Sequence, residues 1–201
     1  MPYFLKSKRV MRYLMLPVAM CCLSASAFAQ QNTALSQMLL AMKYQDQAVR
    51  EVVKQSGGDL TAAQVKHIQK TDNKHTRQLK AIVDKHGWPS LSLVGEDGVQ
   101  AAFLLVQHSP DFTFQQAMLP HIHRAYQNDE GISGQEVALL TDRILIKKGQ
   151  PQKYGTQADI AANTVTFLPI EDADNVDERR AQMGLPPLAE YKNMLEHFYA
   201  K

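Results

Sequence analysis

The chain has 201 residues, of which 45% are hydrophobic and 21% charged, and its formal net charge is +2. This length and composition suit one soluble domain with its own core. The charge balance gives no clustered basic face of the kind that nucleic-acid binding needs, so we expect no nucleic-acid partner.

The first 29 residues have the pattern of an export signal. Four basic residues precede an apolar run of about a dozen residues, and the A-x-A pattern of Ala27 and Ala29 follows it. A transmembrane anchor would need roughly 20 apolar residues. We therefore expect cleavage after Ala29 and a periplasmic or secreted protein, residues 30–201, without a membrane span.

Removal of residues 1–29 changes the chemistry of the chain. Cys21 and Cys22 are its only cysteines, so the mature protein can form no disulfide. Neither cysteine follows the small residue that a lipidation site requires. Four of the 22 Lys and Arg residues are also lost, so 18 remain against 20 Asp and Glu, and the formal charge becomes −2.

The mature chain reads as a series of helices. Apolar residues recur every three or four positions, and Gly57-Gly58, Gly87 and Gly149 follow three of these runs. Pro120 is expected to bend the fourth helix. The pattern predicts helices at about 34–55, 60–86, 99–108, 111–127 and 133–148.

The period changes after Gly149. The β-leaning runs "QKYGTQADI" and "NTVTFLPIE" are joined by a short polar turn and predict a hairpin. Helices at about 174–183 and 187–199 follow. We expect a mainly α (α+β) fold, with residues 30–201 as a single helical domain and one small β-hairpin near residues 152–169.

Polar side chains interrupt the apolar stripes of four helices, and these are Asp46, the pair Asp72 and His75, His108, and the pair Asp142 and Arg143. A buried carboxylate without a partner is costly, so each needs a cation or hydrogen bonds. The candidate partners are Arg50, His108, Arg143 and Arg180. Two interpretations remain open: structural ion pairs that tie helices together, or a shared polar pocket.

The sequence gives little support for a metal or for a serine hydrolase. Asp72 and His75 have the i,i+3 spacing of helical metal ligands. However, there is no H-E-x-x-H motif, and His121 and His123 alternate on a helix and cannot face one ion. No G-x-S-x-G motif is present. We expect no metal and no cofactor, and the sequence leaves open whether Asp72 and His75 join a site or only pair structurally.

Five blocks of sequence resemble a bacterial family catalogued only as a domain of unknown function, number 6624. They are "DQAVR" (46–50), "HGWPSLSLVG" (86–95), "VQH" (106–108), "TDRILIKKGQPQKYGTQ" (141–157) and "VDERRAQMGLPPLAEY" (176–191). Together they cover most of the mature chain in order. The resemblance implies no established activity.

The resemblance separates the candidate residues into two groups. His75, His121 and His123 lie outside the family's pattern, which weakens the metal interpretation further. The residues that fall on it are Asp46, Gln47, Arg50, Gly87, Trp88, Pro89, Gln107, His108, Gln115, Asp142, Arg143, Gln152, Tyr154, Gly155, Thr156, Gln157, Arg180, Gly184 and Leu185.

The first functional hypothesis is a metal-free pocket for a small polar ligand or substrate, with hydrolysis as one reaction. His108 would be the general acid or base, because histidine titrates near neutral pH, and Asp142 or Asp46 would orient it. Arg143 and Arg50 would hold an anionic group.

The polar run after Gly149 would complete this pocket. Gln152, Tyr154 and Gln157 would offer neutral hydrogen bonds, and a bend at Gly155 would turn Tyr154 and Gln157 towards Asp142 and Arg143. The tyrosine hydroxyl would then have a buried partner.

The second hypothesis is a non-enzymatic module that recognises another protein of the cell envelope, with the same polar residues serving as a structural network. A cavity of a few hundred Å³ would favour the ligand pocket, whereas a closed and paired network would favour the module. The sequence does not decide whether the protein is an enzyme.

Overall fold

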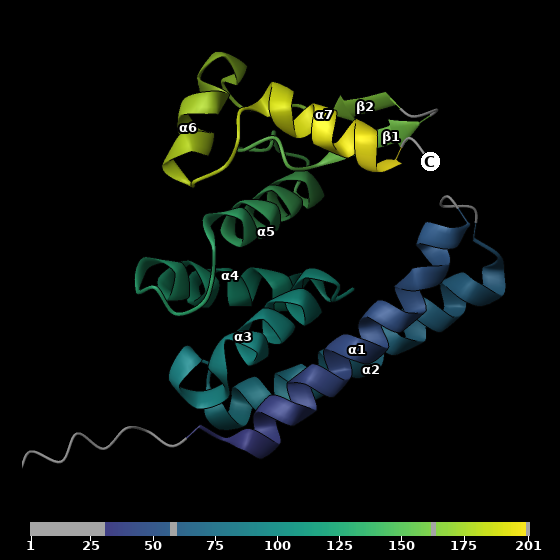
Figure 1. Cartoon of the computed structure of the whole chain (residues 1–201), viewed down its shortest axis with the longest axis vertical. Helices are drawn as coiled ribbons and strands as arrows, with labels where there is room; N and C mark the ends of the chain where they lie inside the picture. The colour runs from purple at the N-terminus through teal and green to yellow at the C-terminus, as the bar shows by residue number, and fades with distance from the viewer. Residues whose placement is uncertain (1–30, 57–59, 162–163, 200–201) are drawn as a thin grey trace, which may run out of the picture.

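The fold is predominantly helical, with one two-stranded antiparallel hairpin (Figure 1). The computed structural model describes residues 31–56, 60–161 and 164–199; the expected export signal, residues 1–29, and Gly57-Gly58 lie outside them. The elements are α1 (Thr33–Gln55), α2 (Ala62–His86), α3 (Leu91–Gln107), α4 (Phe112–Gln127), α5 (Gly134–Lys147), β1 (Ala158–Ala161), β2 (Thr164–Phe167), a 3₁₀ turn (Ala173–Asn175), α6 (Val176–Gln182) and α7 (Leu188–Tyr199). The predicted mainly α (α+β) class is confirmed.

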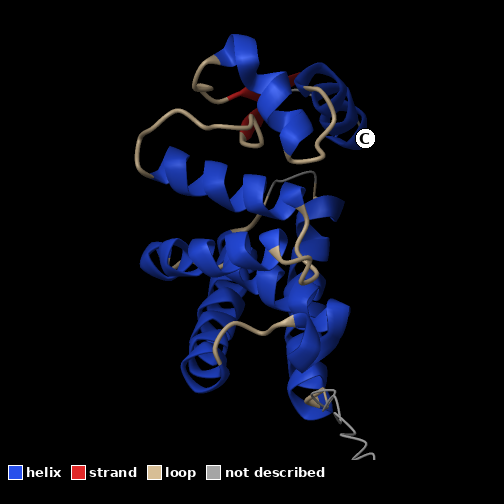
Figure 2. Ribbon diagram, turned by 90° about the vertical axis from the view of Figure 1, so that its left-hand side faces the viewer, coloured by secondary structure: helices blue, strands red, loops and turns tan. Residues whose placement is uncertain are grey.

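The elements form three tiers. Helices α1 and α2 make a long antiparallel pair, α3, α4 and α5 stack on one part of it, and the hairpin with α6 and α7 covers α5 (Figure 1). The perpendicular view shows α5 between the other helices and the C-terminal elements (Figure 2). Helix α5 therefore connects the two regions in which polar groups are buried.

Local sequence signals explain where the helices begin. Thr61 and Gln64 form a reciprocal capping box at α2, and Ser133 and Glu136 form another at α5. The side chain of Asp111 accepts from the backbone N–H of Phe114 at the start of α4. These contacts satisfy backbone donors that a helix leaves unpaired at its first turn.

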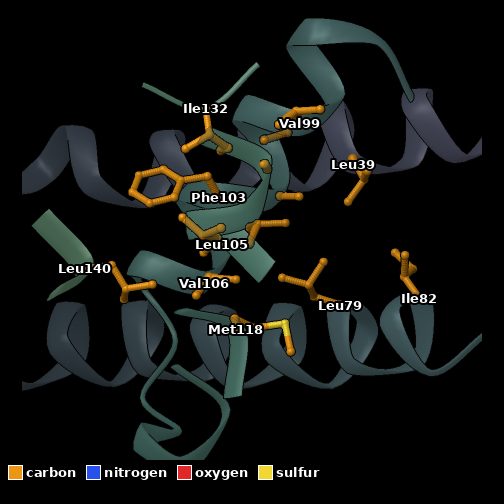
Figure 3. Packing of buried hydrophobic residues seen from close by; sticks show 14 of the residues in the cluster. Leu39, Leu79, Ile82, Val99, Phe103, Leu105, Val106, Met118, Ile132 and Leu140 are labelled. Atoms are coloured by element: carbon orange, nitrogen blue, oxygen red, sulfur yellow. The ribbon is translucent and has the colours of Figure 1, made fainter. Parts of the chain in front are cut away.

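The hydrophobic core lies among α1 to α5. Leu39, Leu79, Val106 and Leu140 are fully buried, and Met118 packs with them (Figure 3). Burying one side chain of this size contributes about 1.5–3 kcal/mol relative to leaving it exposed. This packing fixes the mutual positions of the helices that carry the buried polar groups.

Three details of the prediction are wrong. Helix α3 begins at Leu91 and not near residue 99: a first helical turn is separated from the main helix by a kink at Gly95, where φ is 74°. Val65 is one of the apolar residues spaced three or four apart that predict a buried face of the helix at 60–86, but it is 37% exposed. Residues 152–157 are not a strand, and the hairpin pairs only Ala158–Ala161 with Thr164–Phe167.

Candidate functional site

A buried carboxylate on α1 holds a histidine at the end of α3. Asp46 has no exposed surface, and both its oxygens lie 2.9 Å from Nδ1 of His108. The His108 side chain keeps 22% exposure, and no described residue is hydrogen-bonded to its Nε2. An Nδ1–H that donates to a carboxylate leaves the lone pair of the ring on Nε2.

Arg50 connects this pair to α2. Its Nη1 donates to Asp46 Oδ1 at 2.7 Å, and its Nη2 donates to both oxygens of Asp72 at 2.8 and 2.9 Å. The guanidinium thus lies between two carboxylates and ties α1 to α2. Arg50, expected to hold an anionic ligand, is already paired with two anions inside the protein.

The pKa of Asp46 reflects competing effects. Burial raises the pKa of its carboxyl, but the hydrogen bond and charge of His108, the charge of Arg50 and a hydrogen bond from Gln47 together outweigh burial. The pKa is therefore held below its usual value of 3.8. Asp46 is ionised at neutral pH, as a group that orients an imidazole must be.

His75 lies close to this cluster but bonds to neither of its carboxylates. It is 1% exposed, its Nε2 lies 3.3 Å from Gln45 Oε1, and no described residue is bonded to its Nδ1. Burial lowers the pKa of the ring below 6.5 despite the nearby charges of Asp46 and Asp72. Asp72 thus joins the network through Arg50, and His75 does not pair with it.

Arg143 on α5 has no carboxylate partner within 4.0 Å in the described part of the chain. With the side-chain amide of Gln107 oriented to place its oxygen towards Arg143, that oxygen accepts from Nη2 and Nε at 3.1 Å each. Burial and the charge of Arg50 lower the pKa of the guanidinium. A half-buried cation with only a neutral partner has unmet capacity for an anion.

Lys147 lies one helical turn beyond Arg143 and adds a second cation. Its Nζ donates to Gln115 Oε1 at 2.9 Å, and burial followed by the charge of Arg143 lowers its pKa. Gln115 is fully buried and donates to the carbonyl oxygens of Val106 and Gln107 at the end of α3. The contact with Gln115 joins α5 to the segment that carries His108.

Asp142 belongs to a different network. Its fully buried carboxylate accepts from the backbone N–H groups of Lys153, Tyr154 and Thr156 and from the Thr156 hydroxyl, at 2.8–3.0 Å for the shortest contact of each donor. These donors use both oxygens, and none of them belongs to His108. Because the N–H groups of Lys153, Tyr154 and Thr156 donate to Asp142 and not to a neighbouring strand, these residues do not continue the hairpin; Gln152 forms only an isolated bridge with Ile170.

The side chains of this loop bond mostly within it. Gln152 is fully buried, donates to the carbonyls of Gln157 and Leu168, and accepts from the N–H of Gln157. Tyr154 is 7% exposed, and burial followed by the charge of Asp142 raises the pKa of its phenol. No described residue is hydrogen-bonded to its hydroxyl, so the prediction that the hydroxyl has a buried partner is wrong.

Arg180 on α6 holds the other side of the loop. It is 1% exposed, its Nη1 donates to Tyr154 O at 2.7 Å, and its Nε donates to Pro186 O at 2.6 Å. Gly155 adopts a φ of 72°, so the expected bend occurs there. The peptide "KYGT" is therefore clamped between a carboxylate and a guanidinium.

The predicted site residues fall into two groups in space. His108, Asp46 and Arg50 form one network, and Arg143 reaches it through Gln107, the neighbour of His108. Asp142, Gln152, Tyr154 and Gln157 form the second network around the loop. Sequence reasoning missed Lys147, although its i+4 spacing from Arg143 on a predicted helix was a usable signal.

Two features are absent from the described residues. Among residues 31–56, 60–161 and 164–199, no group of three or more His, Cys, Asp and Glu side chains is arranged to hold a metal ion. None of the helices described there is long and apolar enough to cross a membrane.

The fold and these networks define a mainly helical protein with two internally bonded polar clusters. The family of unknown function DUF6624 matches residues 33–201, and the chain belongs to this family. No curated protein and no solved structure matches the chain.

Proposed function

We propose that the protein binds a small anionic ligand or substrate at the His108–Arg143 site, by which we mean His108, Asp46, Gln107 and Arg143. The observation that carries the proposal is an imidazole held at Nδ1 by a carboxylate, with no described residue bonded to Nε2. The neighbouring residue, Gln107, contacts Arg143, a cation with no carboxylate within 4.0 Å in the described part of the chain. The His108 side chain is 22% exposed, so its Nε2 is open to solvent or to a ligand.

The arrangement suits proton transfer. A carboxylate at Nδ1 sets the tautomer that leaves Nε2 basic, so His108 could take a proton from water or from a substrate hydroxyl. Arg143 would hold the anionic group of the ligand or stabilise negative charge that develops during reaction. Hydrolysis of a small anionic envelope component is the reaction class that we propose.

Export to the periplasm or outside the cell is part of the proposal. It is supported by the basic start, short apolar run and A-x-A pattern of residues 1–29. N-terminal sequencing of protein recovered from the periplasm or medium should begin at Gln30. Recovery there of a chain that begins at Met1 would contradict cleavage.

A non-enzymatic envelope module is the second candidate. The observation in its favour is the extent of internal pairing: Asp46 has three side-chain partners, and Arg50 spans two carboxylates. Residues 30–201 would then present their surface, and not the polar cluster, to a partner protein.

Co-purification distinguishes a ligand site from a paired network. Wild type, Arg143→Gln and Lys148→Gln would be purified in parallel, and small molecules released by denaturation would be identified by mass spectrometry. Lys148 is the matched control, because it is exposed just past the end of the same helix. We expect an anionic compound with wild type and Lys148→Gln, and its loss from Arg143→Gln.

Identical profiles from the three proteins, with circular dichroism showing all of them folded, would contradict the ligand site. A captured compound would then be incubated with wild type and with His108→Gln. Product formation by wild type alone supports acid–base catalysis by His108. Binding by both proteins without turnover supports a binding protein.

A further inference from the structure

A small hollow lies next to the clamped loop, and none of its lining residues belongs to the His108–Arg143 site. Its volume is about 60 Å³, and it is lined by Gln135, Leu139, Thr156, Arg180, Leu185, Pro186, Tyr191 and Met194. This exceeds the 10–15 Å³ that one water needs, but is far below the roughly 300 Å³ of drug-sized sites. Only a molecule of a few heavy atoms fits.

The hollow has one charged group in its wall. Arg180 is 1% exposed, and two of its nitrogens donate to main-chain carbonyls, whereas no described residue accepts from Nη2. The face of the Tyr191 ring lies 4.8 Å from the guanidinium carbon. Within the described ranges, no carboxylate lies within 4.0 Å of the guanidinium. Burial lowers the pKa of Arg180, and the more distant charges of Tyr191, Asp177 and Asp142 offset only part of that effect.

The remaining lining residues indicate which kind of molecule the hollow would bind. Thr156 already donates its hydroxyl to Asp142, so it offers no proton to a ligand. Leu139, Leu185, Pro186 and Met194 supply apolar surface. A cation at one side of an apolar hollow matches a molecule with one anionic end and a short apolar end.

We propose that the hollow, here named the Arg180 hollow, binds a short-chain carboxylate of the size of acetate or propionate. The carboxylate meets Nη2 of Arg180, and the alkyl end packs against the leucines and Met194. Guanidinium and carboxylate form short charge-assisted hydrogen bonds, which would give the buried guanidinium a directly bonded anion.

Nuclear magnetic resonance of the purified ¹⁵N-labelled protein tests this assignment. Propionate would be titrated at constant ionic strength while the resonances of Thr156 and Leu185 and the Nε–H of Arg180 are followed. Propionamide, which has the same shape but no charge, and chloride are the comparison probes. We expect saturable shifts with propionate and none with propionamide or chloride.

Substitution at the mouth of the hollow provides the matched control. Met194 is 56% exposed, so changes there should leave the fold intact, whereas loss of the buried Arg180 would release two loops. We expect Met194→Trp to block the hollow and weaken propionate binding about tenfold or more, and Met194→Ala to keep it.

Four outcomes would overturn the proposal. The first three are the absence of saturable shifts with propionate, equal binding of propionamide, and saturation by chloride at the same resonances, which would indicate a halide site. Unchanged propionate affinity in folded Met194→Trp would place any binding outside the hollow.

Discussion

Replacement of Asp142 by asparagine tests whether one carboxylate organises the C-terminal region. The carboxylate receives four donors, two of which come from Thr156, and has no exposed surface. An asparagine amide keeps one oxygen and presents an NH₂ group in place of the other. If the remaining oxygen accepts from the N–H groups of Lys153 and Tyr154, the backbone N–H of Thr156 faces the NH₂ group, which is itself a donor.

The expected cost follows from the bonds that are lost. Hydrogen bonds to a charged group contribute about 1.5–3 kcal/mol each, and a buried donor left unsatisfied costs about 1–3 kcal/mol. Disruption of a buried charged network commonly destabilises by about 3–5 kcal/mol, and we expect Asp142→Asn to fall in that range. For a domain of this size, the melting temperature should fall by about 6–20 °C.

Urea denaturation followed by circular dichroism measures the free energy of unfolding. Asp84→Asn is the control, because Asp84 is exposed on α2 and should change stability by about 0.5 kcal/mol or less. A loss below about 1 kcal/mol for Asp142→Asn would refute the reasoning, since a single neutral hydrogen bond is worth about that much.

Three further substitutions test other contacts. Gly155→Ala should lower the free energy of unfolding in urea by at least about 1–2 kcal/mol, because φ is 72° and the new Cβ would lie 2.6 Å from Leu188 Cδ1. An unchanged free energy of unfolding would show that the loop can rearrange. Asp46→Asn should destabilise at pH 7. The pKa of Asp46 is lower in the folded than in the unfolded chain, so the stability that its charge contributes is full above about pH 3.8 and is lost as the pH falls through the folded pKa. The difference in free energy of unfolding between wild type and Asp46→Asn should therefore narrow between pH 7 and pH 3. A difference that stays constant with pH contradicts the role of the charge. Tyr154→Phe should change stability by about 0.5 kcal/mol or less, since the hydroxyl makes no hydrogen bond to a described residue, and a larger loss in thermal melts would reveal a partner.

The sequence predicted much of the fold because its helix signals are local. The capping residues Thr61, Asp111 and Ser133 lie within three residues of the backbone groups that they satisfy. Periodicity therefore placed α2, α4 and α5 within one or two residues. The loop at residues 152–157 could not be predicted in this way, because its N–H acceptor, Asp142, lies 11–14 residues away on a helix.

The candidate site was predictable as a set of residues but not as a set of contacts. Breaks in apolar periodicity identified Asp46, His108 and Asp142 as groups that need partners. Which aspartate meets His108 depends on how α1 and α5 pack against α3, and that packing depends on side chains throughout the core. The same limit applies to Arg180, whose partners are main-chain carbonyls that carry no sequence signal.

The two aspartates that looked equivalent in sequence differ in what surrounds them. Asp142 is bonded by donors that cannot change with pH or ligand, so its role is to hold the loop in one conformation. Asp46 is bonded to Nδ1 of His108, and no described residue is bonded to the other ring nitrogen, Nε2. Only the second arrangement has a ring nitrogen that a bound molecule could reach. Under the function proposed above, the chemistry takes place at His108 and Arg143 selects the charge of the ligand.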